Sequence, residues 1–284
     1  MFRSATELIT VSATVQDRQG RAVADLRQQD FTLTEDDRLQ EIAVFARDTD
    51  TPLSVELVVD VSGSMADKLE NVEDALRHFT RVMRSDDEIG LIEFNSVVGS
   101  VVPLDAPRER LTRAFDRLRA DGGTALFDAV IQGLETLRDA RHRKRVLLLL
   151  TDGNDTASRA SQRDAVTAVI RSEALVYVLG LGHGRRGSFG HADDTVDIGT
   201  LRALAQPSGG RAELIENPHS GGVDRVDETV GGFSRELREQ YTLGYYPQPG
   251  AGENGKTRRL RVTLRNPDYV VRARTAYGAP VGAR

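Results

Sequence analysis

Residues 55–64 read Val-Glu-Leu-Val-Val-Asp-Val-Ser-Gly-Ser, an apolar run that ends in an Asp-x-Ser-x-Ser pentapeptide. The apolar part does not alternate with polar residues, which is typical of a strand covered by helices on both faces. The pentapeptide brings the carboxylate of Asp60 and the hydroxyls of Ser62 and Ser64 close together along the chain. These groups suit a hard divalent cation such as Mg2+, and they also suit the cap of a following helix. The pentapeptide alone leaves both interpretations open.

The segment 53–240 around this stretch alternates strands and helices. We expect strands at 55–61, 88–94, 97–102, 145–150, 175–181 and 211–215, and helices at 67–84, 108–120, 125–140, 161–173, 198–205 and 223–240. This alternation predicts an α/β fold, a doubly wound and mostly parallel six-stranded sheet with helices on both faces. The gap before residue 97 is short enough for a hairpin, so one edge strand is expected to be antiparallel.

The two flanks have a different, all-β character. We expect strands at 7–15, 30–35 and 40–47 before the central segment, and at 241–246, 257–265 and 269–277 after it. Three strands cannot bury an apolar face without a partner. We therefore expect residues 1–50 and 241–284 to pair as one small β-sandwich, with the 53–240 domain inserted between its halves.

Oxygen-bearing side chains follow separate strands of the predicted sheet. Asp60, Ser62 and Ser64 follow the first core strand, Thr124 lies in a Gly-Gly-Thr loop just before a helix, and Asp152 follows the strand 145–150. Ligands of open α/β sheets bind beyond the carboxyl ends of the strands, at the point where the strand order reverses. Two carboxylates and three hydroxyls meeting there would suit a divalent cation in both ligand type and charge.

At these residues the chain resembles the von Willebrand factor type A domain over residues 53–240. The metal-ion-dependent adhesion site of that family uses Asp-x-Ser-x-Ser, a distant Thr and a distant Asp, and all five positions are filled here in order. The resemblance implies Mg2+ (or Mn2+ or Ca2+) as the bound ion and a Glu or Asp of a partner protein at its open coordination position. It therefore implies a protein-binding module rather than an enzyme, and a last helix that shifts when ligand coordinates the metal.

The N-terminal flank contains Asp17-Arg-Gln-Gly20…Val23…Leu26…Asp30-Phe31, and the C-terminal flank contains Tyr241-Thr-Leu-Gly-Tyr245…Val271-Arg-Ala-Arg274…Tyr277-Gly278. In these residues the flanks look like those of a bacterial subgroup first noted in acidobacteria, whose members are mostly exported. The N-terminal residues have no signal-peptide core. The chain itself leaves the compartment undecided. The resemblance favours a periplasmic or secreted protein whose signal peptide is absent from this sequence, and a cytoplasmic protein is the alternative. Neither the partner nor the oligomeric state can be read from the sequence.

Composition excludes several other classes. The chain has no Cys, which excludes disulfides and thiol catalysis, and its net charge of −5 offers no reason to expect nucleic acid binding. No apolar run approaches the ~20 residues of a membrane span. The best enzymatic alternative is Mg2+-dependent phosphoryl hydrolysis or transfer through Asp60, although Ser62 stands where a second acid would be expected.

The segment 182–197 contains two weaker signals. Residues 182–187 fit G-x-G-x-x-G, but a loop rather than a helix is expected to follow, which argues against a dinucleotide site. His183, His191, Asp193 and Asp194 could bind a second metal, and a solvated loop explains them more simply.

Overall fold

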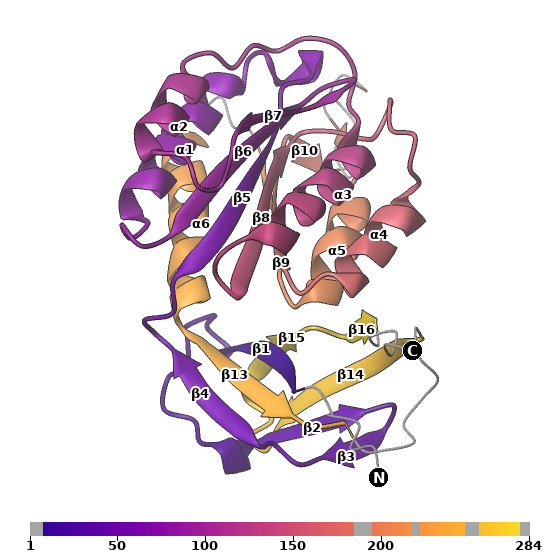
Figure 1. The fold of residues 1–284 in the computed structure, drawn as a ribbon. Coiled ribbons are helices and arrows are strands. Elements are labelled where there is room, and N and C mark those ends of the chain that lie inside the picture. Colours follow the sequence, from indigo (N-terminus) through magenta and orange to yellow (C-terminus); the bar gives the residue numbers. More distant parts are fainter. Residues whose placement is uncertain (1–7, 185–194, 217–221, 248–255, 279–284) are drawn as a thin grey trace.

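The computed structural model describes residues 8–184, 195–216, 222–247 and 256–278, and these form two bodies that pack end to end (Figure 1). One body is a six-stranded sheet with helices on both faces. The other is a pair of four-stranded antiparallel sheets around a shared apolar core. None of the helices in these residues combines the length and the apolar character needed to cross a membrane.

The six-stranded sheet has the predicted doubly wound architecture. Its strands are β5 (Leu53–Asp60), β6 (Glu88–Phe94), β7 (Val98–Val102), β8 (Lys144–Thr151), β9 (Leu175–Leu181) and β12 (Ala212–Ile215). Their order is β12-β9-β8-β5-β6-β7, and only the edge strand β7 is antiparallel to its neighbour. The chain leaves β5 toward β6 and leaves β8 the opposite way, toward β9. The strand order therefore reverses between β5 and β8, where a ligand is expected at the carboxyl edge.

Helices cover both faces of this sheet, which explains its uninterrupted apolar strands. One face carries α1 (Leu69–Val82), α2 (Arg108–Phe115) and α6 (Gly222–Arg238), and the other carries α3 (Leu126–Thr136), α4 (Gln162–Arg171) and α5 (Ile198–Ala205). Within β5, Val55, Leu57 and Val59 pack in the first core, whereas Val58 packs in the second. Burial on both faces removes the alternation that a half-exposed strand would show.

The flanks form the β-sandwich that the sequence predicts. One sheet has the order β15-β1-β13-β4, and the other has the order β16-β14-β2-β3. The bounds in the first sheet are β1 Ile9–Gln16, β4 Val44–Asp48, β13 Gln240–Tyr245 and β15 Val270–Ala273; in the second they are β2 Phe31–Glu35, β3 Arg38–Gln40, β14 Thr257–Leu264 and β16 Ala276–Gly278. Each sheet contains strands from both flanks, so neither flank can form its sheets alone.

Two predicted strands in the flanks are wrong. Residues 40–47 do not form one strand, because the chain crosses from β3 in one sheet to β4 in the other, with Ile42 buried between them. Residues 269–277 divide in the same way into β15 and β16. At that break, Arg274 donates to the backbone oxygens of Ile170 and Ser172 in the α/β body. When a chain crosses from one sheet of a sandwich to the other, its apolar pattern stays nearly the same. The sequence therefore does not show where the crossing occurs.

The segment 182–197 contributes a short parallel pair, β10 (His183–Gly184) with β11 (Thr195–Val196). The possible second metal site at His183, His191, Asp193 and Asp194 lies outside the described side chains.

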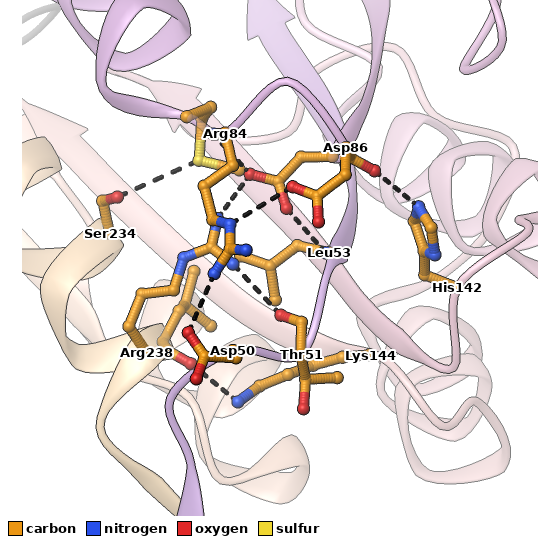
Figure 2. Close-up of polar contacts among 12 residues, drawn as sticks. Asp50, Thr51, Leu53, Arg84, Asp86, His142, Lys144, Ser234 and Arg238 are labelled. Carbon is orange, nitrogen blue, oxygen red and sulfur yellow. Dashed lines mark hydrogen bonds and ion pairs between the residues drawn. The ribbon is translucent and has the colours of Figure 1, made fainter.

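Figure 2 shows the junction between the two bodies, where α6 ends and the sandwich begins. Arg238, in the last turn of α6, donates to the backbone oxygen of Thr51 at 3.0 Å and pairs with Asp87. Lys144, the first residue of β8, donates to the backbone oxygen of Leu237 at 2.6 Å. Burial lowers the pKa of Lys144 to about 8. These contacts hold the end of α6 against the chain that enters β5 and against the start of β8.

Candidate metal centre

Backbone hydrogen bonds join the loops at the carboxyl edge of the central sheet. Gly63, after β5, donates its N–H to the backbone oxygen of Gly122 at 3.0 Å. Thr156, after β8, donates to the backbone oxygen of Thr124 at 2.8 Å, and Ala125 donates to the loop between β6 and β7. This edge lies at the end of the sheet remote from the sandwich (Figure 1). The loops that carry the predicted site residues are therefore held together as one surface.

Asp60 is the last residue of β5 and its side chain is completely buried. One carboxylate oxygen accepts the backbone N–H of Ser62 at 2.8 Å, and the other accepts the hydroxyl of Thr151 at 2.6 Å. Both donors are neutral, and no ion pair to Asp60 occurs within the described part of the chain. Burial raises the pKa of Asp60 to about 6, although these hydrogen bonds oppose the rise. A cation beside this carboxylate would remove much of that burial penalty.

Ser62, Ser64 and Asp152 form a chain of hydrogen bonds next to Asp60. The hydroxyls of Ser62 and Ser64 lie 3.1 Å apart, and the Ser64 hydroxyl donates to Oδ1 of Asp152 at 2.9 Å. Ser62 and Asp152 are buried, whereas Ser64 is exposed. The group therefore reaches solvent on the Ser64 side.

Thr124 approaches the same place from the start of α3. A Cβ atom built on Gly153 would lie 3.5 Å from the Thr124 hydroxyl and 3.7 Å from Oδ2 of Asp60. The Thr124 and Asp60 oxygens therefore border one small space beside Gly153. The structure brings all five predicted residues together at the carboxyl edge, from three loops that are far apart in the sequence.

Lys68 is a part of this cluster that we did not predict as a site residue. It is buried, and its ammonium group lies 2.7 Å from Oδ2 of Asp152 and donates to the backbone oxygen of Ser64 at 2.9 Å. The signal available in the sequence was weak: Lys68 is one of only three lysines, placed four residues after Ser64 at the start of a helix. Thr151 was also missed, and its position directly before Asp152 was the available hint.

Two acidic residues, Asp155 and Asp67, lie close in sequence to the predicted ligands. In such places an acid can accept hydrogen bonds from metal-bound waters or cap a helix. Asp155 accepts the N–H of Phe127 at 3.4 Å, in the first turn of α3, where Ser158 also accepts that N–H at 3.0 Å. The position of Asp155 therefore favours the capping role. Asp67 is exposed.

The donor set fits a hard divalent cation. It consists of carboxylate and hydroxyl oxygens, the ligand types that Mg2+ and Mn2+ prefer. Across the described residues, no group of three or more His, Asp or Glu side chains could hold a metal. The hydroxyl-rich cluster at the carboxyl edge is therefore the candidate metal centre, with Asp60, Ser62, Ser64, Thr124 and Asp152 as its potential ligands.

Comparison with known proteins identifies the domain that carries this cluster. Residues 55–154 match the family model of the von Willebrand factor type A domain. A von Willebrand factor type A protein from Catenulispora acidiphila has the same fold, with a TM-score of 0.56 and 14% identity over 98% of this chain and 75% of that one. The chain thus carries a von Willebrand factor type A domain. Domains of this type commonly act as metal-dependent adhesion or interaction modules.

Two further proteins are similar to this chain, one in sequence and one in fold. An uncharacterised protein of Synechocystis sp. is 30% identical over 189 residues, which cover 64% of this chain and 43% of that protein. The chain thus spans less than half the length of that relative. Proximal thread matrix protein 1 of the mussel byssus, described with a zinc-occupied metal-ion-dependent adhesion site, has a TM-score of 0.51 and 15% identity over 66% of this chain and 48% of that one.

Proposed function

We propose that this protein binds a partner protein through a divalent metal ion, held by Asp60, Ser62, Ser64, Thr124 and Asp152. The main support is Asp60, a fully buried carboxylate that faces only neutral donors and borders the same small space as Thr124. Mg2+ is the expected ion, with Mn2+ or Ca2+ as alternatives, and an Asp or Glu of the partner is the expected outside ligand. The site opens to solvent at Ser64, where such a side chain can approach.

An exposed apolar residue next to the site favours a protein as the partner. Val97 is 71% exposed, and it lies in the loop whose Ser96 hydroxyl accepts the N–H of Gly123 at 2.7 Å. An exposed apolar side chain next to the site can pack against a protein surface, because the buried core of a protein interface is more apolar than the rest of the surface.

The alternative, phosphoryl transfer through Asp60, has less support. A nucleophilic carboxylate must reach the phosphorus atom, but Asp60 is buried and each of its oxygens already accepts a hydrogen bond. Ser62 stands where a second acid would be needed. A generic phosphate ester assayed with and without Mg2+ tests this alternative, and we expect no metal-dependent turnover.

Calorimetric titration with Mn2+ and Mg2+ tests metal binding. We expect saturable binding to the wild type and none to Asp60→Ala, with both proteins folded by circular dichroism. The matched control is Glu56→Gln, which removes a buried carboxyl group on the same strand, about 13 Å away, and should bind metal as the wild type does. Equal binding by the wild type and Asp60→Ala would refute the proposed site.

Partner binding is tested by affinity capture from the native organism in Mg2+, followed by elution with EDTA. We expect a protein that elutes with EDTA from wild-type bait and is missing from Asp60→Ala bait. Retention of the same protein in EDTA would contradict the metal-bridged mode.

We also propose that the protein acts outside the cytoplasm, in the periplasm or as a secreted protein. The support is the resemblance of the flanking sequences to mostly exported bacterial proteins. Cell fractionation with an antibody against this chain tests the proposal, and detection in the cytoplasm alone would refute it.

A further inference from the structure

Lys68 places a positive charge inside the candidate metal centre. Its side chain is only 1% exposed, and its ammonium group contacts both Oδ2 of Asp152 and the backbone oxygen of Ser64. An ammonium group buried this deeply stays near its counter-ion, because moving it into the apolar interior would leave both charges unpaired. The ion pair is therefore a fixed part of the site.

The two oxygens of Asp152 have separate partners. Oδ2 faces Lys68 at 2.7 Å, whereas Oδ1 accepts the hydroxyl of Ser64 at 2.9 Å, and that hydroxyl lies 3.1 Å from the hydroxyl of Ser62. Oδ1 thus belongs to the group of potential ligands, and Oδ2 belongs to the ion pair. Asp152 can serve the metal through Oδ1 and keep Lys68 on Oδ2.

This arrangement changes the charge of the site. Asp60 and Asp152 alone would just balance a divalent cation, but with Lys68 the ligand cluster carries only one net negative charge. A bound divalent cation would then leave one net positive charge in a largely buried place, where charge is weakly screened. A carboxylate arriving from outside would restore neutrality.

We propose that the charge of Lys68 lowers the metal affinity of the domain when no anionic ligand is bound. Tight retention of the metal then depends on an anionic ligand. This inference rests on the proposed metal site and adds a regulatory property to it. Metal and acidic ligand would bind cooperatively, and each would strengthen the other by the same factor. The domain would then hold its metal firmly only while it holds its partner.

The first test measures Mn2+ affinity by the electron paramagnetic resonance signal of free Mn2+, in buffer without carboxylates. We expect Lys68→Met to bind Mn2+ about tenfold more tightly than the wild type, because one nearby repulsive charge is gone. Lys68→Arg keeps the charge and should remain weak. Lys256→Met is the control: it removes an exposed lysine of the sandwich and should leave the affinity unchanged.

The second test adds acetate as a probe for the partner carboxylate, with correction for acetate that binds Mn2+ in solution. We expect acetate to tighten Mn2+ binding to the wild type and to Lys68→Arg, and to have a much smaller effect on Lys68→Met. An equal effect of acetate on all three proteins would overturn the proposed role of Lys68.

The outcomes separate this inference from the metal site itself. If neither the wild type nor Lys68→Met binds Mn2+, the metal site fails and the inference fails with it. If the wild type binds and Asp60→Ala does not, but Lys68→Met binds no more tightly than the wild type, only the role of Lys68 is refuted. Binding by Lys68→Met alone would support both. If Lys68→Met does not fold, Lys68→Gln replaces it under the same criteria.

Discussion

Thr151 is not one of the five potential ligands, but it makes hydrogen bonds to Asp60 and to the loop beside the candidate metal centre. Its hydroxyl donates to Asp60 at 2.6 Å and accepts the N–H of Gly153 at 3.0 Å, so it fixes the orientation of the carboxylate and of the loop beside it. Groups that orient metal ligands in this way often affect metal affinity strongly.

Replacing Thr151 by Val should therefore weaken Mn2+ binding by about tenfold or more and destabilise the fold by roughly 1–3 kcal/mol, since Asp60 would lose a buried hydrogen bond. Calorimetric titration and urea unfolding measure the two effects. Thr80→Val is the control, because the Thr80 hydroxyl is buried and donates only to the backbone oxygen of Leu76 within α1. Unchanged Mn2+ affinity in Thr151→Val would contradict the supporting role.

The residues of the candidate centre were predictable to different degrees. Asp60, Ser62, Ser64 and Asp152 follow predicted strands, and Thr124 lies in a Gly-Gly-Thr loop before a predicted helix. The resemblance to the von Willebrand factor type A domain then joined these five residues into one expected site. Lys68 and Thr151 carried no such signal. Their roles depend on where their side chains point after folding, and a lysine at the start of a helix is most often exposed.

At the scale of the elements, the central strand β5 contains a second buried acid. Glu56 is fully buried, both of its carboxylate oxygens lack a hydrogen-bond partner among the described residues, and Gly90 on β6 leaves room for it. Burial raises the pKa of Glu56 to about 8 from its usual 4.5. The folded protein thus keeps a proton that the unfolded chain releases above pH 4.5.

This difference makes folding stability depend on pH with a definite sign. Between pH 4.5 and 8 the folded state binds more protons, so the free energy of unfolding should fall as pH rises through this window. Glu56→Gln removes this pH dependence. The free energy of unfolding of the variant, relative to that of the wild type, should therefore be ~3 kcal/mol higher at pH 7 than at pH 5. Urea unfolding of metal-free protein at both pH values measures it. Parallel pH dependence in the wild type and the variant would contradict a buried, protonated Glu56.

The sandwich has its own buried polar cluster. Glu35 of β2 accepts the hydroxyls of Tyr245 at 3.1 Å and Tyr277 at 2.5 Å, and its other oxygen lies 3.2 Å from Arg258. Tyr245 belongs to one sheet, and the other three residues belong to the opposite sheet. The cluster therefore joins the two sheets, and it also joins the N-terminal flank to the C-terminal one.

We expect Tyr245→Phe to cost roughly 1–2 kcal/mol, because Glu35 would lose one of its buried donors. Tyr246→Phe is the neighbouring control, since Tyr246 is exposed. Thermal unfolding of both variants measures the difference, and equal stabilities would argue against the cluster as a tie between the sheets.

The elements were more predictable in the α/β body than in the flanks. Apolar strands buried on both faces and amphipathic helices gave the six strands and their alternation directly. The strands at 40–47 and 269–277 failed because a chain that changes sheets keeps its apolar pattern while its hydrogen-bond partners change. Pairing between distant flanks is a tertiary property that local patterns do not report.

At the scale of the whole molecule, α6 connects the metal-bearing body to the sandwich. Its C-terminal turn is held by Arg238, which contacts Thr51 and Asp87, and by Lys144, which contacts Leu237. Glu236, in the same last turn of the helix, also pairs with Arg272 of the sandwich at 2.7 Å. If α6 shifts, its contacts with the two bodies must therefore either break or move together with the helix.

From the resemblance we predict that occupancy of the metal centre changes the orientation of the sandwich through α6. Arg238→Met should loosen the junction and enlarge this change. Small-angle scattering with and without Mg2+ and acetate measures it in the wild type and the variant. Identical profiles in all four conditions would count against any coupling between the two bodies.

The central claim is that Asp60, Ser62, Ser64, Thr124 and Asp152 together hold a divalent metal. Anomalous diffraction from crystals grown with Mn2+ tests it most directly, because the ion is located without reference to any partner. We predict one strong peak at the carboxyl edge of β5 and β8, at about 2.1–2.2 Å from oxygens of this group, and no such peak for Asp60→Ala. A wild-type map without a peak there, or with its main peak elsewhere, would contradict the claim.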